Sequence, residues 1–187
     1  MRLLERTNRA AARRVQATPA LDELMAARVR ECWRLDCRLF VLPLWPLEDH
    51  VSPVPHAENL FRTRHGLQSK RVVMCSGNLS PVHPIDTALK AALVLREDER
   101  LVLAFIGDGG QRAAVEAAIR RDRLERVLVL PYQPLAELRY SLSAADAHWV
   151  SMGADMVGIV PRARCMARWP RRGQCSTSAP RGLTSAS

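Results

Sequence analysis

Short continuous apolar runs alternate with helix-like stretches through the middle of the chain. The runs at Arg71–Ser76 and Leu101–Ile106 each stop at a glycine, and Val127–Leu130 stops at a proline. A strand in a parallel sheet covered by helices on both faces is apolar along its whole length. The pattern therefore predicts an α/β domain over residues 67–160, with a fourth strand at Ala147–Ser151.

The stretches between these runs carry apolar residues at helical spacing. Helices are predicted over residues 58–66, 85–95, 111–121 and 135–143. Because a helix follows each strand, the carboxyl ends of the strands meet at one edge of the sheet, where such folds bind ligands. Gly77, Gly107 and Gly109 fall at this edge, which indicates a domain that handles a nucleotide.

The chain before this domain has a different pattern. Residues 1–42 are predicted to be helical and then to form a short strand at 39–42. Thr18 is expected to cap a helix whose first residue is Pro19. Residues 43–66 are interpreted as a proline-rich linker with a short helix closed by glycine, because proline continues neither a helix nor a strand ladder.

Charge is distributed unevenly along the 187 residues. The net charge is +9, but residues 161–187 carry six arginines and no acid. The remaining 22 basic residues face 19 acidic ones, so residues 1–160 carry only +3. The basic excess therefore lies in a tail without hydrophobic period, which we expect to be disordered.

The five cysteines are odd in number and form no CxxC pair, which is typical of free thiols in a reducing cytoplasm. The first residues, MRLLER, lack the apolar segment of a secretory signal. No apolar stretch approaches the roughly 20 residues that span a bilayer. These observations predict a cytoplasmic protein.

Four segments together carry a family resemblance. They are SGNLSPVHPIDT at Ser76–Thr87, FIGDGG at Phe105–Gly110, VLPYQPLAELRYSLSAADAHWVSMG at Val129–Gly153 and VGIV at Val157–Val160. In this order and spacing they resemble the C-terminal, donor-binding half of family 4 glycosyltransferases, over about residues 40–160. The resemblance is to the bacterial type that acts in surface-polysaccharide synthesis. It implies the Rossmann-like C-terminal domain of the two-domain GT-B architecture, here incomplete.

The resemblance also implies which residues hold the donor nucleotide-sugar. They are Gly77, Asn78, His83, Gly107, Gly109, Tyr132, Gln133, Gly153, Gly158, Ile159 and Val160. The backbone at Gly77 and Asn78 would approach the diphosphate, since a residue without Cβ allows that approach. His83 would offer a polar or basic group to the phosphates. No residue of this chain is assigned a catalytic or metal-binding role.

The remaining residues of this set have matching roles in the family. Tyr132 and Gln133 would face the nucleotide base, and the loop from Gly153 to Val160 would close over the sugar and diphosphate. Structural interpretations stay open beside these roles: plain turns at the glycines, an exposed loop histidine at His83 and a core-edge ring at Tyr132. Asp146 is interpreted as a structural residue at a helix end.

The chain departs from the family after Val160. The helix with a carboxylate or Pro-x-Lys group, and the following RPVL-type strand, are missing. A shift of one base after Val160 permits, with suitable codons, readings of Pro-Cys-Lys and Arg-Pro-Val-Leu. We therefore hypothesise that the tail is frameshifted, with a functional basic tail as the alternative. Residues 1–42 would be the remnant of a preceding acceptor domain, so the chain is expected to be truncated at both ends.

The implied activity is retaining transfer of a sugar, from a nucleotide-sugar that we expect to be UDP-linked, to a glycan or lipid-linked acceptor. No cofactor beyond this substrate is expected. The fragment alone is expected to be inactive. The expected partners are a separate acceptor-domain chain or a membrane-linked acceptor at the inner face of the membrane, and not a nucleic acid.

Other function classes remain as alternatives. A non-catalytic nucleotide-binding module, or the donor subunit of a split enzyme, fits the same motifs. An NAD-type dehydrogenase is disfavoured because the loop from Gly77 to Val82 is not GxGxxG. Binding of nucleic acid would rest on the arginine tail alone and would fall steeply with salt. No GxSxG, HExxH or cysteine–histidine arrangement supports a hydrolase.

Overall fold

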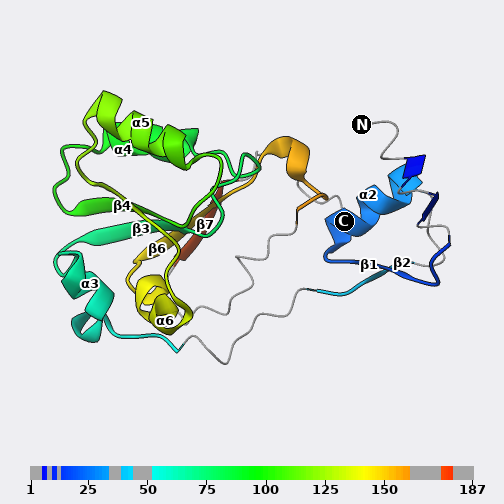
Figure 1. Ribbon diagram of the computed structural model, residues 1–187, viewed down its shortest axis with the longest axis horizontal. Coiled ribbons are helices and arrows are strands. Elements are labelled where there is room, and N and C mark those ends of the chain that lie inside the picture. Colours follow the sequence, from blue (N-terminus) through cyan, green and yellow to red (C-terminus); the bar gives the residue numbers. More distant parts are fainter. Residues whose placement is uncertain are drawn as a thin grey trace. The chain divides into compact units, whose positions relative to one another are not determined.

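The computed structural model describes residues 6–7, 10–11, 14–33, 39–43, 52–160 and 174–178 of the chain, with side chains except at Trp33 and 174–178. The chain forms two compact units (Figure 1). The smaller comprises Met1–Pro46 and Ala154–Met166, and the larger comprises Leu47–Gly153 and Ala167–Ser187. Ala154–Val160, which the apolar pattern assigned to the sheet domain, thus lies in the smaller unit.

The larger unit is built on a parallel sheet with the strand order β5-β4-β3-β6-β7. The strands are β3 (Arg71–Ser76), β4 (Leu101–Ile106), β5 (Val127–Leu130), β6 (Ala147–Ser151) and β7 (Gln174–Ser178). The first four have the bounds that the apolar runs predict. The order reverses between β3 and β6, so β3 lies in the middle with the later strands on either side.

Helices cover both faces of this sheet, as predicted. Figure 1 shows α4 (Asp86–Val94) and α5 (Arg112–Asp122) over one face. On the other lie α3 (Leu60–Arg64) and α6 (Leu135–Ser143). The predicted helix at 58–66 is divided, because a 3₁₀ turn, η3 (His56–Glu58), precedes α3.

The boundary between these two pieces lies at Asn59. Its side-chain oxygen accepts hydrogen bonds from the amides of Phe61 and Arg62, which caps α3. The predicted end at Gly66 is confirmed, since its φ is +64°.

Alternating residues of β3 and β4 supply two separate cores. Val72, Met74 and Ala104 pack with Phe61 of α3 on one face. On the other face Cys75, Leu103 and Phe105 pack with Val115 of α5. Successive side chains of a strand point to opposite faces, so a strand buried on both faces must be apolar at every position. This is the physical basis of the runs that predicted the fold.

The smaller unit contains a short parallel pair, β1 (Thr18–Ala20) and β2 (Leu39–Val41), with α2 (Glu23–Trp33) between them in the chain. The prediction that Thr18 caps a helix starting at Pro19 is wrong. Both residues lie in β1, and Asp22 caps α2 by accepting a hydrogen bond from the amide of Met25 at 2.7 Å. Proline is tolerated in β1 because β1 pairs with one neighbour only among the described residues.

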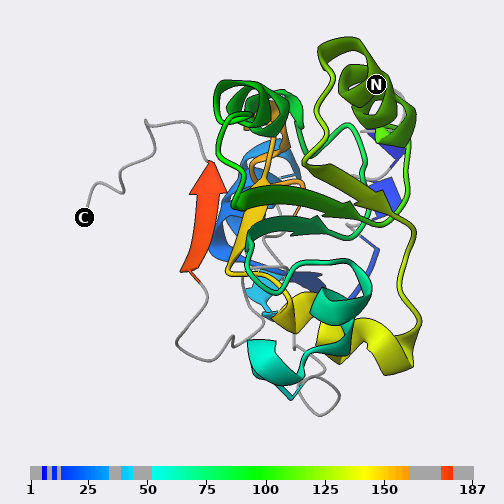
Figure 2. The same cartoon turned by 90° about the vertical axis from the view of Figure 1, so that its left-hand side faces the viewer.

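The tail also differs from expectation where it is described. Gln174–Ser178 forms β7, which pairs in parallel with β6 (Figure 2). The expected absence of regular structure is therefore corrected for these five residues. The rest of the predicted tail, 161–173 and 179–187, lies outside the described residues, as does 44–51 of the predicted linker.

A buried arginine joins the elements at the amino ends of the strands. The side chain of Arg62 is 2% exposed. Its guanidinium donates to the carbonyl oxygens of Ala144 and Leu67, each at 2.6 Å, and to that of Lys70. It also lies 3.4 Å from a carboxylate oxygen of Asp146.

That carboxylate has a second role at the start of β3. The amide of Val72 donates to it at 2.7 Å, and the Asp146 amide donates to the Val72 carbonyl at 2.8 Å. The structural interpretation of Asp146 is thus confirmed, and Arg62 with Asp146 fixes α3 to β3 and to the start of β6.

We predict that Arg62→Met lowers the free energy of unfolding by about 3 kcal/mol, because three buried carbonyls and a carboxylate lose their partner. The matched control is Arg64→Met on the same helix. Arg64 is exposed and pairs with Glu137 at 3.3 Å, so its loss should cost less than about 1 kcal/mol. Urea unfolding of both variants checks this. Equal losses of stability in the two variants would contradict this structural role of Arg62.

We predict a second effect on stability from His148 of β6. Burial lowers the pKa of His148 below its ordinary value, although the hydrogen bond with the Leu142 carbonyl opposes the shift. The unfolded chain therefore binds the proton more readily, and stability is lost as pH falls from about 6.5 towards the folded pKa. His148→Gln should flatten the stability profile between pH 5 and 7.5.

The control for this profile is Arg120→Gln, an exposed change on α5 that leaves every histidine in place. It should leave the slope unchanged in urea titrations. A residual slope is expected in both variants, since burial also lowers the pKa of His65. The account fails if His148→Gln retains the whole slope of the parent.

Candidate functional site

The turns that follow β3 and β4 stack on one another at the carboxyl edge of the sheet. The amide of Gly77 donates to the Ile106 carbonyl at 2.7 Å, and that of Gly107 donates to the Leu130 carbonyl at 2.9 Å. The hydrogen bonds between neighbouring strands therefore continue into the turns that follow β3 and β4. The edge that the sequence predicted as the ligand site is continuous from β3 to β5.

Two glycines are required for this stacking. Gly107 has φ +139°, and a Cβ placed there would clash with the carbonyl oxygen of Gly77. Gly109 has φ +144°, and its Cβ would lie 2.5 Å from Oδ1 of Asn78 and 2.7 Å from the Leu79 carbonyl oxygen. Packing between the two loops therefore accounts for both glycines by itself.

Further hydrogen bonds join the loop after β3 to the turn after β4 and to the start of α5. The Leu79 amide donates to the Asp108 carbonyl at 2.8 Å, and the Gln111 amide donates to the Leu79 carbonyl at 2.9 Å. The Gln111 side chain donates to the carbonyls of Ser80 and His83 at 2.5 and 2.8 Å. Gln111 was not predicted as a site residue. Its place directly after the glycine turn was the available signal.

The end of β6 is joined to the loop after β3. The Gly153 amide donates to the Val82 carbonyl at 3.0 Å. Nδ1 of His83 lies 2.6 Å from the Ser151 carbonyl oxygen. His83 is therefore half-buried and held in place, rather than a loosely exposed loop residue.

Tyr132 and Gln133 lie in the segment after β5. Tyr132 is 55% exposed, so it is not a core residue, and its hydroxyl donates to the Asp108 carbonyl at 3.4 Å. Its ring also borders Gly107. Gln133 donates to the carbonyl of Pro131 at 2.9 Å. The exposed ring of Tyr132 thus borders the turn after β4, beside these hydrogen-bonded loops.

Three helices begin at this edge without a side-chain cap. They are α4, α5 and α6, whose preceding residues Ile85, Gln111 and Pro134 make no capping hydrogen bond from the side chain. The first amides of a helix carry partial positive charge and attract anions. The edge thus offers several backbone donors where a phosphate group could be bound.

The described strand-end loops and first helical turns of this edge comprise residues 77–88, 107–114, 131–137 and 152–153. Among them, Arg112 is the one permanent cation. Its guanidinium donates to the Gly107 carbonyl at 3.2 Å and to Glu116 at 3.0 Å. A cation is unfavourable in the first turn of a helix, so these two contacts offset that cost. Arg112 was also not predicted from the sequence.

The last three predicted site residues lie in the smaller unit. Gly158 has φ +73° and packs on α2, where a Cβ would lie 2.8 Å from the Leu24 carbonyl oxygen. Arg28 of α2 donates to the Val157 carbonyl at 3.2 Å. Ile159 and Val160 follow at the end of this segment, and Ile159 is largely exposed. Their role at the donor stays a prediction.

Comparison with known proteins agrees with this architecture. No family model matches the chain. The chain is 31% identical over 115 residues to the probable glycosyltransferase WbjE of Pseudomonas aeruginosa, covering 62% of this chain and 28% of WbjE. It is 30% identical over 82 residues to the putative colanic acid biosynthesis glycosyl transferase WcaI of Escherichia coli (strain K12), covering 44% of this chain and 20% of WcaI.

Solved glycosyltransferase structures share the fold. HepE of Anabaena, in complex with UDP and glucose, superposes with a TM-score of 0.69 at 17% identity, over 81% of this chain and 42% of HepE. WaaG, involved in lipopolysaccharide biosynthesis, gives 0.60 at 16% identity, over 72% of this chain and 37% of WaaG. The resemblance to GT-B glycosyltransferases is confirmed. The chain spans less than a third of the length of the two curated relatives.

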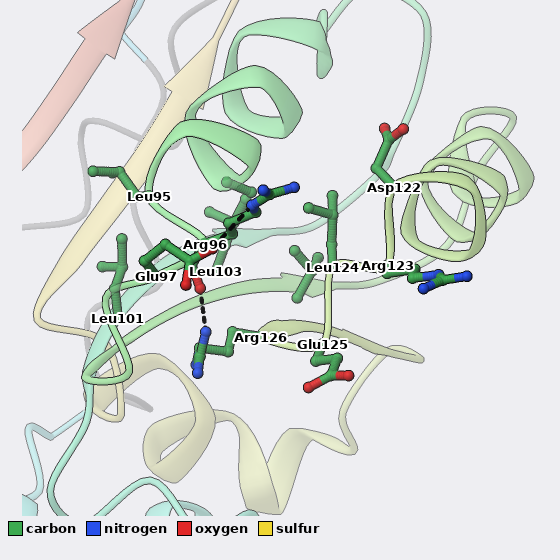
Figure 3. Close-up of a pocket in the computed structure, with 12 residues that line it drawn as sticks. Leu95, Arg96, Glu97, Leu101, Leu103, Asp122, Arg123, Leu124, Glu125 and Arg126 are labelled. Atoms are coloured by element: carbon green, nitrogen blue, oxygen red, sulfur yellow. Dashed lines mark hydrogen bonds and ion pairs between the residues drawn. The ribbon is translucent and has the colours of Figure 1, made fainter.

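A cavity of about 340 Å³ lies at the opposite edge of the sheet from these loops (Figure 3). Leu101 and Leu103 line it near the start of β4, and Leu124 lines it before β5. Three arginines and three acidic residues surround it: Arg96, Arg123, Arg126, Glu97, Asp122 and Glu125. The charges balance, so the cavity has no evident preference for an anion and does not coincide with the predicted site.

Metal-ligating side chains do not gather in the described part of the chain. No three His, Cys, Asp or Glu residues lie close enough there to hold an ion together.

We predict that Gly107→Ala destabilises the larger unit by at least about 3 kcal/mol, because the backbone is strained for any other residue and Gly77 blocks the Cβ. Gly110→Ala is the matched control in the same turn. There the nearest atom to a Cβ is Cδ of Pro81 at 3.9 Å, and the change should stay below about 1 kcal/mol. Thermal unfolding of both variants decides the matter, and a tolerated Gly107→Ala would refute the stacking argument.

Proposed function

We propose that this chain provides the donor-binding part of a retaining glycosyltransferase of bacterial surface-polysaccharide synthesis. The enzyme would transfer a sugar from a UDP-sugar to a glycan or lipid-linked acceptor. The proposal rests on the carboxyl edge of the sheet. There the loops after β3, β4 and β6 are hydrogen-bonded to one another, and helices begin without a side-chain cap. The names of the relatives, and the complexes of HepE with UDP and with UDP-glucose, support the substrate class.

Each residue of the edge has a proposed place at the donor. The backbone at Gly77 and Asn78, with the first amides of α4, would bind the diphosphate. His83 would add a ring nitrogen to the same group. Tyr132 and Gln133 would contact the base from the segment after β5. Gly153 would contact the sugar and diphosphate.

The chemical contribution of these residues would be electrostatic. Negative charge develops on the leaving diphosphate as the bond to the sugar breaks, and preorganised donors stabilise it. The three helix N-termini and Arg112 supply such positive potential at one edge, so we propose that no metal or other cofactor is obligatory. Asp86, Asp108 and Glu137 lie on the same edge and outnumber Arg112, so attraction of the diphosphate would rest on the backbone donors rather than on net charge.

The acceptor would be bound by another domain or by a separate chain. Among the described residues, no helix is long and apolar enough to cross a bilayer. We propose that the enzyme acts in the cytoplasm, at the inner face of the membrane, where a lipid-linked acceptor presents its head group.

We predict that the 187-residue chain binds UDP-glucose with one saturable site and a Kd below about 1 mM, in the range typical of enzyme substrates. Arg112→Gln should weaken binding about tenfold, the effect of losing one charge-assisted contact. Arg120→Gln, an exposed change near the other end of α5, should have no effect. Isothermal titration calorimetry measures all three, and absence of binding by the parent chain would refute the proposed function.

The same 187 residues tested alone should give no sugar transfer above background. Positioning of the acceptor against the donor supplies a large part of the rate, and an unpositioned acceptor loses it. A radiolabelled UDP-glucose assay with extracted glycolipid as acceptor tests this. Measurable turnover would show that this chain also binds the acceptor.

A further inference from the structure

The contact between His83 and Ser151 fixes the position of a hydrogen atom. Nδ1 of His83 lies 2.6 Å from the carbonyl oxygen of Ser151. A carbonyl oxygen only accepts hydrogen bonds, so Nδ1 must carry the hydrogen. When the ring is neutral, Nε2 then carries none and presents a lone pair. The ring turns this second nitrogen away from Ser151.

The surrounding backbone holds this arrangement from several sides. The carbonyl of His83 accepts a hydrogen bond from the Gln111 side chain at 2.8 Å. The neighbouring Val82 carbonyl accepts from the Gly153 amide at 3.0 Å, next to the end of β6. These two contacts hold the backbone on either side of the ring, and the hydrogen bond from Nδ1 to the Ser151 carbonyl orients the ring itself. The hydrogen on Nδ1 therefore follows from the position of the Ser151 carbonyl at the end of β6.

This tautomer is the wrong one for an anion. A bare Nε2 and a phosphate oxygen are both acceptors and repel one another, whereas a protonated ring donates from Nε2 and adds a positive charge. We propose that His83 receives the diphosphate of a nucleotide-sugar only as the imidazolium, so that donor binding takes up one proton at Nε2. This inference rests on the proposed function, because it assigns the protonation state of the same site.

No other group at this edge is expected to take up a proton when the donor binds. Among the described strand-end loops and first helical turns, Arg112 and His83 are the only nitrogen bases, and Arg112 already contacts Gly107 and Glu116. The charged groups of these elements at the carboxyl edge are Asp86 at the start of α4, Asp108 in the turn after β4, and the pair Arg112–Glu116 on α5. Lys90 of α4 and Arg120, Arg121 and Asp122 of α5 follow further along their helices. The segment 151–153 adds none. All of these groups stay unchanged in the test.

The choice of ligand isolates the proton on the protein. The terminal phosphate of UDP is substituted only through its anhydride bond, so it has a second ionisation near pH 6 that would confuse the measurement. Each phosphate of UDP-glucose carries one ester bond and the shared anhydride bond, so neither has a proton that titrates near neutrality. Any proton taken up when UDP-glucose binds must therefore come to the protein.

The experiment is calorimetric titration of the full chain with UDP-glucose from pH 6 to 8.5, in pairs of buffers that differ in ionisation enthalpy. We expect the heat to show uptake of one proton at pH 8. The association constant should fall about tenfold for each pH unit in the alkaline range, because only the protonated ring binds.

Three variants separate the role of His83 from its environment. His83→Lys should bind without proton uptake and with little change between pH 6 and 8.5, since its charge is permanent. His83→Gln should bind weakly, also without proton uptake. His56→Gln, a change at η3 on the opposite edge, should behave like the parent chain. Thermal unfolding of each variant verifies that it is folded.

Two results would overturn the inference by itself. One is binding of UDP-glucose that is independent of pH and takes up no proton, which would leave the proposed function standing. The other is a ¹⁵N spectrum of the free protein that places the neutral ring's hydrogen on Nε2. Failure of both the parent and His83→Lys to bind at any pH would instead refute the proposed function and, with it, this inference.

Discussion

The close approach of the turns after β3 and β4 is the constraint on which the candidate site depends. A side chain at Gly107 would clash with the Gly77 carbonyl, so the two strand ends can meet only through bare backbone. Once they meet, the amides of Gly77 and Leu79 find partners on the neighbouring turn. The loops are then fixed relative to the sheet. Their precision comes from backbone packing, which costs no side-chain entropy.

The opposite edge of the sheet is organised by different means. There, the buried guanidinium of Arg62 is shared among three carbonyl oxygens and Asp146, which itself pairs with the backbone of Val72. Burial of a charge is favourable only when such partners surround it. Side-chain contacts thus hold the amino edge, while three helices begin at the carboxyl edge without a side-chain cap.

The sequence pointed to most of the candidate site, but not to how its parts are joined. Gly77, Gly107, Gly109 and His83 were identified from strand-end position and from the family resemblance. Gln111 was missed, because its side chain contacts carbonyl groups of another loop and these contacts follow no spacing in the chain. Arg112 was missed because its i,i+4 spacing to Glu116 is that of an ordinary helix-surface pair. The hydrogen bond from His83 to Ser151 joins residues 68 positions apart. Pairings over such distances depend on the strand order, which no local pattern encodes.

The sequence by itself determined the strands β3 to β6, because a strand buried on both faces must be apolar at every position, whatever its neighbours are. It likewise determined α4, α5 and α6, whose apolar residues recur with the helical period. Only the tertiary structure decided the conformation at Thr18 and Pro19, where pairing with β2 overrides a local capping signal. It also decided the strand at Gln174–Ser178, whose polar residues are extended by hydrogen bonds from β6 rather than by their own preference.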